Sequence, residues 1–206
     1  QRMHARIFSL FLLIASLLPT NFHSLPFPDG IKTLQVAAGH HTHNVQLTGQ
    51  YGGVTCAVTV QGSFAYLGVG PRVVVLNIAD PQDPIIVGQS EVLSSIVKHV
   101  AAVGNYAYVA AEDSGLYILD ITQPADPRLV GHYASIQGTT GVDVVGDYAY
   151  VTSEQGVLFI LDVSNPSLTF EVGSISALGK ALDVAVVGDY AYVAGGGGGL
   201  RIIDIS

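Results

Sequence analysis

From about residue 54 onward, the apolar residues fall into short runs rich in Val, Ile and Tyr. Each run is about five to seven residues long and is bounded by Gly, Asp, Asn or Pro, which favour turns. No run leaves room for a helix of about ten residues, and the alternation in segments such as YAYV has the two-residue period of a strand. The pattern therefore predicts short β-strands joined by tight turns.

These predicted strands recur at a fixed spacing. The octapeptide VVGDYAYV occupies 144–151 and returns unchanged at 186–193, and looser copies stand at 102–109 (AVGNYAYV) and 60–67 (VQGSFAYL). Repeats of about 20 to 50 residues are typical of solenoids, propellers and arrays. The glycines of the four copies are 42 residues apart, at Gly62, Gly104, Gly146 and Gly188, and the Asx residues that close the third run keep this spacing to within one residue, at Asn77, Asp120, Asp162 and Asp204.

Within a unit, the first two runs are joined by a two-residue turn such as Gly146-Asp147. Glycine suits this turn because it adopts a positive φ without steric cost. Four antiparallel strands in about 42 residues is the size of one propeller blade. We therefore predict an all-β fold over 45–206, a β-propeller of four-stranded antiparallel blades with four blades visible, and we expect the repeated Tyr148 and Tyr190 to be buried.

The number of blades that close the ring is open at the sequence level. The fourth unit stops at Ser206, before the proline turn found in the earlier units, while VQLTGQY at 45–51 resembles the outer run PRLVGHY at 127–133. One interpretation is that 45–51 supplies the missing outer strand and closes a four-bladed ring without exposed edges. The other interpretation, which we favour from sequence, is a truncated part of a longer propeller.

The residues before the repeats have a different pattern. Arg2, His4 and Arg6 precede an apolar run at 7–18, which matches a secretory signal peptide and is too short to span a bilayer. We predict a signal peptide at 1–24 and a linker at 25–44; the alternative is a buried helix of the mature fold. The predicted location is extracytoplasmic, either secreted or at the cell surface.

Charge and composition limit the classes of ligand and partner that we expect the chain to bind. Sixteen acidic and eight basic residues give a net charge of -8, which repels nucleic-acid phosphates and anionic lipid. The sequence predicts neither metal nor cofactor, because His40, His41 and His43 lack matching carboxylates or thiolates and suit a solvated tract. We expect the single cysteine, Cys56, to be a small buried apolar residue.

The repeated segments VVGDYAYV and GLYILDITQPADP resemble the units of the LVIVD-repeat family, over about residues 54–206. The first unit departs most from the family pattern, with Asn77 in place of the usual aspartate. The resemblance implies a propeller-like domain of LVIVD-type repeats in exported or cell-surface proteins. It implies no common activity and no catalytic residues.

Candidate site residues are those that differ between units at equivalent positions of the first strand, which is expected to line the central channel. Five positions before the turn glycine, the units carry Ala57, His99, Gly141 and Asp183; three positions before it, they carry Thr59, Ala101, Asp143 and Ala185. Packing does not demand such variation, so it is where function can be grafted onto a scaffold. We predict that His99, Asp143 and Asp183 form a ligand-binding site in the channel.

Three functional hypotheses follow, and we favour the first. The chain is an exported, non-catalytic module that binds a protein, peptide or glycan at the cell surface, as a monomer or as part of a longer chain. Alternatively, it is a hydrolase or lyase that uses a pair of channel carboxylates, such as Asp143 and Asp183. The third hypothesis is a structural spacer within a larger surface protein.

Overall fold

The structure is a computed structural model that describes residues 48–50, 54–176 and 179–206. The predicted signal peptide and linker lie outside these residues. Among the residues described, no helix is long and apolar enough to cross a membrane.

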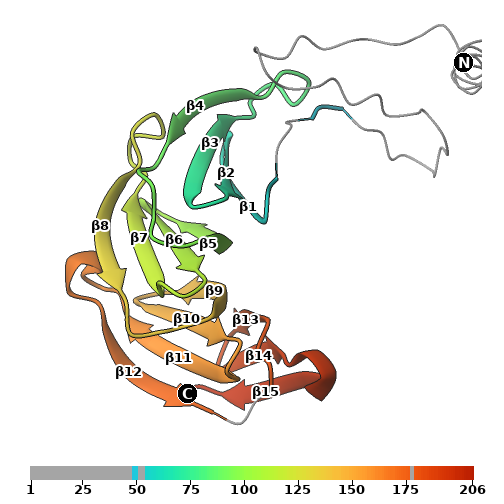
Figure 1. Cartoon of the computed structure of the whole chain (residues 1–206), viewed down its shortest axis with the longest axis vertical. Coiled ribbons are helices and arrows are strands. Elements are labelled where there is room, and N and C mark those ends of the chain that lie inside the picture. Colours follow the sequence, from blue (N-terminus) through green and yellow to red (C-terminus); the bar gives the residue numbers. More distant parts are fainter. Residues whose placement is uncertain (1–47, 51–53, 177–178) are drawn as a thin grey trace, which may run out of the picture. The chain divides into compact units, whose positions relative to one another are not determined.

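Four antiparallel sheets, here called blades, follow one another along the chain (Figure 1). Within each blade the strands are paired in chain order. The first blade is β1 (Ala57–Gln61), β2 (Phe64–Val69), β3 (Arg72–Asn77) and β4 (Ile85–Gln89); the second is β5 (Val97–Val103), β6 (Tyr106–Ala111), β7 (Leu116–Asp120) and β8 (Arg128–Tyr133); the third is β9 (Thr139–Val145), β10 (Tyr148–Ser153), β11 (Val157–Asp162) and β12 (Phe170–Ile175); the fourth is β13 (Asp183–Val187), β14 (Tyr190–Ala194) and β15 (Leu200–Asp204). Two single-turn 3-10 helices, Pro166–Leu168 and Gly196–Gly198, lie in loops. The predicted all-β fold of repeated antiparallel blades is confirmed.

Each blade has two ends that recur through the structure. At the hairpin end, the first strand turns into the second at a glycine with φ near 60°, as at Gly104 (59°) and Gly146 (59°). The third strand finishes at the same end, where Asp120 is paired with Tyr106 and Asp162 with Tyr148. At the opposite end, called the loop end, the first strand begins and the second strand joins the third.

The hydrophobic core lies between blades. The first strands of successive blades pack side by side, β1 with β5, β5 with β9 and β9 with β13. One apolar cluster joins the first blade to the second, another joins the second to the third, and a third joins the third to the fourth. The second and third sheets therefore bury both faces against neighbouring sheets, and the first and fourth sheets bury one face in this way among the residues described.

The tyrosine prediction was wrong in detail. Tyr148 and Tyr190 are 42% and 45% exposed, whereas Tyr150, two residues further along the same strand as Tyr148, is 7% exposed and packs between the third and fourth blades. Tyr148 and Tyr190 lie directly beside the hairpin turns, where they are paired with Val145 and Val187 at the end of the sheet. The neighbouring blade covers the middle of the strand, and so it covers the second tyrosine of the YAY segment.

The expectation for Cys56 was also wrong, because its side chain is exposed and free. Cys56 immediately precedes the first residue of β1, and its backbone N–H donates to the carbonyl of Gly68 at 3.0 Å. Its position just outside the strand explains why the valine-rich context did not bury it.

Candidate functional site

Two of the three predicted site residues meet at the loop end. Nε2 of His99, on β5, lies 3.8 Å from Oδ1 of Asp183, on β13. These strands belong to the second and fourth blades, and the residue at the same position of the third blade is Gly141. A Cβ on Gly141 would lie 2.7 Å from Oδ1 of Asp183, so the missing side chain leaves the space in which histidine and aspartate approach each other.

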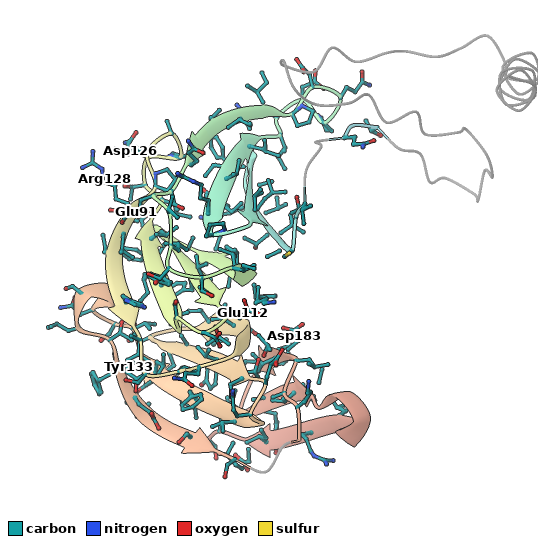
Figure 2. The ribbon with its side chains drawn as sticks, viewed as in Figure 1. Glu91, Glu112, Asp126, Arg128, Tyr133 and Asp183 are labelled. Carbon is teal, nitrogen blue, oxygen red and sulfur yellow. The ribbon has the colours of Figure 1, made fainter. Side chains whose placement is uncertain are left out.

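The residue that precedes His99 in the chain takes part in an ion pair. Nζ of Lys98 lies 2.9 Å from Oε1 of Glu112, and both side chains are about one-third exposed (35% and 34%). The hydrogen bond to Glu112 raises the pKa of Lys98. Lys98 directly precedes His99 in the chain, so we group Lys98, His99, Glu112 and Asp183 as the loop-end cluster; Figure 2 shows the labelled Glu112 and Asp183 side chains in the same part of the molecule.

The backbone conformation of Glu112 is unusual. Among the residues described, Glu112 alone has a positive φ (28°) without being a glycine. Its carbonyl accepts hydrogen bonds from the backbone N–H of Thr139 (2.6 Å) and from Thr139 Oγ1 (2.9 Å), which hold the second blade to the third. Sparsely populated backbone conformations persist only where the surroundings enforce them, and they are enriched at functional sites.

Two β-bulges also occur at the loop end. The pairing of β5 with β6 shifts between Val97 and His99, which makes Lys98 the extra residue. The pairing of β9 with β10 shifts between Val151 and Ser153, opposite the Thr140-Gly141 segment. No such shift occurs in the β1–β2 or β13–β14 pairs. Bulges change the direction of side chains and are over-represented near active sites, and here they coincide with the residues that vary between blades.

A hydroxyl network fixes the strand that carries Asp183. Thr140 Oγ1 donates to the carbonyl of Ala181 (2.8 Å) and lies 2.9 Å from Thr152 Oγ1, which accepts from the N–H of Gly141 (3.0 Å). Because each hydroxyl has one hydrogen, this arrangement is satisfied when Thr152 donates to Thr140. The third blade thereby holds the backbone two residues before Asp183.

Asp143, the third predicted site residue, is engaged by the backbone. Its Oδ1 accepts from its own neighbour's N–H, Val144 (2.8 Å), and its Oδ2 accepts from the N–H of Val186 on β13 (2.7 Å). The structure therefore gives Asp143 a contact that ties the third blade to the fourth. It brings His99 and Asp183 together in a way that sequence alone did not specify.

The chemistry available to the cluster is that of charge and hydrogen bonding. Asp183 is 57% exposed and can pair with a cation, while His99 Nδ1 is buried without a hydrogen-bond partner among the residues described. In the same part of the chain, no group of three His, Cys, Asp or Glu side chains has the arrangement of a metal site. Neither Lys98 nor Glu112 was predicted to belong to the site. A signal existed for Lys98, because its position also varies between units, as Cys56, Lys98, Thr140 and Leu182.

The model of the LVIVD repeat matches the chain at residues 52–91, 96–135, 138–176 and 178–206. The chain belongs to the LVIVD-repeat family. Four matched repeats agree with the four blades, and the predicted resemblance is confirmed.

Several solved structures share this propeller-like fold. The computationally designed Ika4 protein is similar with a TM-score of 0.61 at 11% identity, over 80% of this chain and 100% of that one. The designed Ika8 protein is similar with a TM-score of 0.62 at 10% identity, over 73% and 46% of the two chains. BamB from Moraxella catarrhalis is similar with a TM-score of 0.56 at 19% identity, over 74% and 47%. At these identities the likeness shows the fold alone, and the chain spans about half the length of Ika8 and BamB. No curated protein matches the chain.

Proposed function

We propose that this chain is an exported, non-catalytic propeller module that binds a protein, peptide or glycan at the cell surface through its loop-end cluster. The observation that carries the proposal is the meeting of His99 with Asp183 across Gly141, with the Lys98–Glu112 pair beside them. These residues differ between blades that otherwise repeat, and such positions are where function can be grafted onto a scaffold.

The cluster offers charges of both signs over a short distance. Lys98 and Glu112 already neutralise each other in part, whereas Asp183 is more than half exposed. A partner with a cationic group can pair with Asp183 while its hydrogen-bond acceptors reach Lys98. The location at the cell surface rests on the apolar segment at 7–18 and on what the family resemblance implies.

Binding is favoured over hydrolase or lyase chemistry by the state of Asp143. A carboxylate pair needs one group that acts as an acid or a base, but both oxygens of Asp143 accept backbone hydrogen bonds, one of them from the next blade. Removing this carboxylate from the candidate pair leaves the His99–Asp183 contact, which suits recognition.

The test is a comparison of variants on arrays of immobilised peptides and glycans. The full chain is compared with Asp183→Asn and with Asp189→Asn, which makes the same charge change at the exposed hairpin end. We expect a class of array members that the wild type and Asp189→Asn bind equally and that Asp183→Asn binds about tenfold more weakly, equivalent to about 1.4 kcal/mol.

Two outcomes contradict the proposal. If Asp183→Asn and Asp189→Asn bind alike, the loop-end cluster is not the binding site. If array members are cleaved by the wild type and spared by Asp183→Asn, the chain is an enzyme and the hydrolase or lyase hypothesis replaces the binding hypothesis.

A further inference from the structure

A set of three paired residues recurs at the hairpin end of the second, third and fourth blades. In the third blade Val145 pairs with Tyr148, and Tyr148 pairs with Asp162 on its other side. Residues paired directly across antiparallel strands point to the same face of the sheet, so the valine, tyrosine and aspartate stand side by side. The other blades repeat this set, and we call the three sets the hairpin-end rows: Val103, Tyr106 and Asp120; Val145, Tyr148 and Asp162; Val187, Tyr190 and Asp204.

The apolar members of these rows are accessible to a partner. The three valines, Tyr148 and Tyr190 are between 42% and 68% exposed, and Tyr106 is partly buried. A Cβ placed on any of the four turn glycines would meet no described atom within 4 Å, so the space beside the turns is open. Burial does not explain why valine and tyrosine recur there. Exposed apolar groups that gather on one face are typical of an interaction surface.

The aspartates of the rows carry a charge that their turns do not need. In the first blade, Oδ1 of Asn77 accepts the N–H of Ala79 at 2.9 Å, as Oδ1 of Asp120 accepts the N–H of Thr122 at 2.8 Å. A neutral residue therefore serves this turn equally well. The hydrogen bonds from Thr122 hold the pKa of Asp120 below its usual value, so this carboxylate is charged at neutral pH.

The hairpin end as a whole is strongly acidic. Of the five Lys and Arg side chains described, only Arg128 lies there, and its Nε donates to Oδ2 of Asp126 at 2.7 Å (Figure 2). Eight aspartates lie in the hairpin turns, at the ends of the third strands and in the proline turns that follow: Asp80, Asp83, Asp120, Asp126, Asp147, Asp162, Asp189 and Asp204. The exposed valines and tyrosines therefore stand in a negative field, which favours a cationic partner.

We propose that the hairpin-end rows form a docking surface for an arginine-rich segment of a partner protein. A guanidinium stacks on the ring of a tyrosine while its N–H groups bond to the neighbouring aspartate, and its alkyl stem packs on the valine. Three successive blades repeat the row, so a segment with several arginines engages several rows at once. A second copy of this chain is a poor occupant, because two hairpin ends would bring charges of the same sign together.

The first blade offers a natural contrast. Its residues at the same positions are Gln61, Phe64 and Asn77, which provide neither the carboxylate nor the phenol. The surface therefore extends over the second to fourth blades. It is separate from the loop-end cluster, which lies at the opposite end of the blades, so the two binding proposals can fail independently.

The test is the fluorescence anisotropy of a labelled oligo-arginine peptide titrated with the full chain. We expect Asp120→Asn/Asp162→Asn/Asp204→Asn to bind the peptide about tenfold more weakly than the wild type. Asparagine keeps the acceptor of each turn, as in the first blade, and thermal unfolding at pH 7 checks that the variant is folded. The matched control, Glu91→Gln/Asp113→Asn/Glu154→Gln, removes three exposed charges at the loop end and should bind within about twofold of the wild type.

A second variant tests the aromatic contribution without a change of charge. Tyr148→Leu/Tyr190→Leu keeps apolar side chains but removes two rings, so it should bind oligo-arginine about two- to fivefold more weakly. An oligo-lysine peptide of the same length should bind the wild type more weakly than oligo-arginine does, because an ammonium group lacks the planar face that stacks on a ring.

Four results would overturn the proposal. Equal weakening by the two triple variants would show that the peptide responds to net charge alone. Unchanged binding by Tyr148→Leu/Tyr190→Leu would show that the rows do not contact the peptide. Weakening by Asp183→Asn, without weakening by the hairpin-end triple variant, would place the peptide at the loop-end cluster. A dimer in sedimentation velocity that Tyr148→Leu/Tyr190→Leu converts to a monomer would show that a second copy occupies this surface.

Discussion

The two ends of the blades differ in what they repeat. At the hairpin end the amino-acid sequence is nearly the same in successive blades. The repeated side chains are nevertheless exposed: Val145 is 46% exposed, Val187 68% and Tyr190 45%. At the loop end the residues change from blade to blade, yet hydrogen bonds between neighbouring blades hold the backbone there, from Thr139 to Glu112 and from Thr140 to Ala181. A residue that repeats between blades is therefore not necessarily buried, and a position that varies between blades is not necessarily free of structural contacts.

The difference has a physical cause. What repeats at the hairpin end is a requirement of the backbone, a glycine with positive φ and an aspartate or asparagine turn, and neither needs a covered side chain. What varies at the loop end is held by specific hydrogen bonds that each blade makes differently. Substitutions at the two ends should therefore have distinct consequences for stability.

The largest expected effect separates the two tyrosines of one YAY segment. Tyr150→Ala removes an aromatic ring packed between the third and fourth blades and should lower the free energy of unfolding by about 3 to 5 kcal/mol. Tyr148→Ala, at the hairpin end, should cost about 1 kcal/mol or less, because its ring is 42% exposed. Urea denaturation of both variants measures the difference. Equal losses would mean that the hairpin end is covered.

An intermediate effect is expected at the loop end. Thr140→Val keeps the shape of the side chain but removes the hydroxyl that joins Thr152 to Ala181, both of which are buried. We expect a loss of about 1 to 3 kcal/mol in the free energy of unfolding, since buried polar groups lose a partner. The control is Thr55→Val at an exposed position, which should change stability by less than about 0.5 kcal/mol. A loss no larger than that of the control would mean that the network does not hold the fourth blade.

The sequence predicted the blades because their determinants are local. The strand period and the turn glycines repeat every 42 residues and need no knowledge of distant contacts, as Gly62, Gly104, Gly146 and Gly188 show. The choice between Tyr148 and Tyr150 could not be predicted, because it depends on how far along the strand the next blade reaches. That distance is a property of packing between units and not of either unit alone.

Some of the candidate site residues could also be predicted from local sequence, because they occupy equivalent positions of the repeat. Position within the repeat selected His99 and Asp183, which the structure brings to 3.8 Å. The same reasoning selected Asp143, whose carboxylate instead accepts the N–H of Val186 in the next blade. It missed Lys98 and Glu112, whose pairing depends on a bulge in β5 and on a positive φ at Glu112, and neither feature has a sequence signature.

The smallest expected effect is on the pH dependence of stability, and it arises from an aspartate at the hairpin end. Hydrogen bonds from the hydroxyl and the backbone N–H of Thr122 lower the pKa of Asp120. A depressed folded-state pKa contributes stability that is present above the unfolded value, near 4, and is lost as pH falls through the folded value. Asp120→Asn keeps an acceptor, as Asn77 does in the first blade, but removes the titration.

Thermal unfolding of the two chains between pH 7 and pH 3 tests this. Asp120→Asn should be close to the wild type at pH 7 and should lose less stability than the wild type below about pH 4, where the wild-type carboxylate becomes protonated. Thr122→Val removes the hydroxyl donor and keeps the backbone donor, so its loss between pH 7 and pH 3 should be intermediate. If all three curves have the same slope, the turn at Asp120 is not held by its charge, and the repeated aspartates of the hairpin end act as neutral acceptors, in the manner of Asn77.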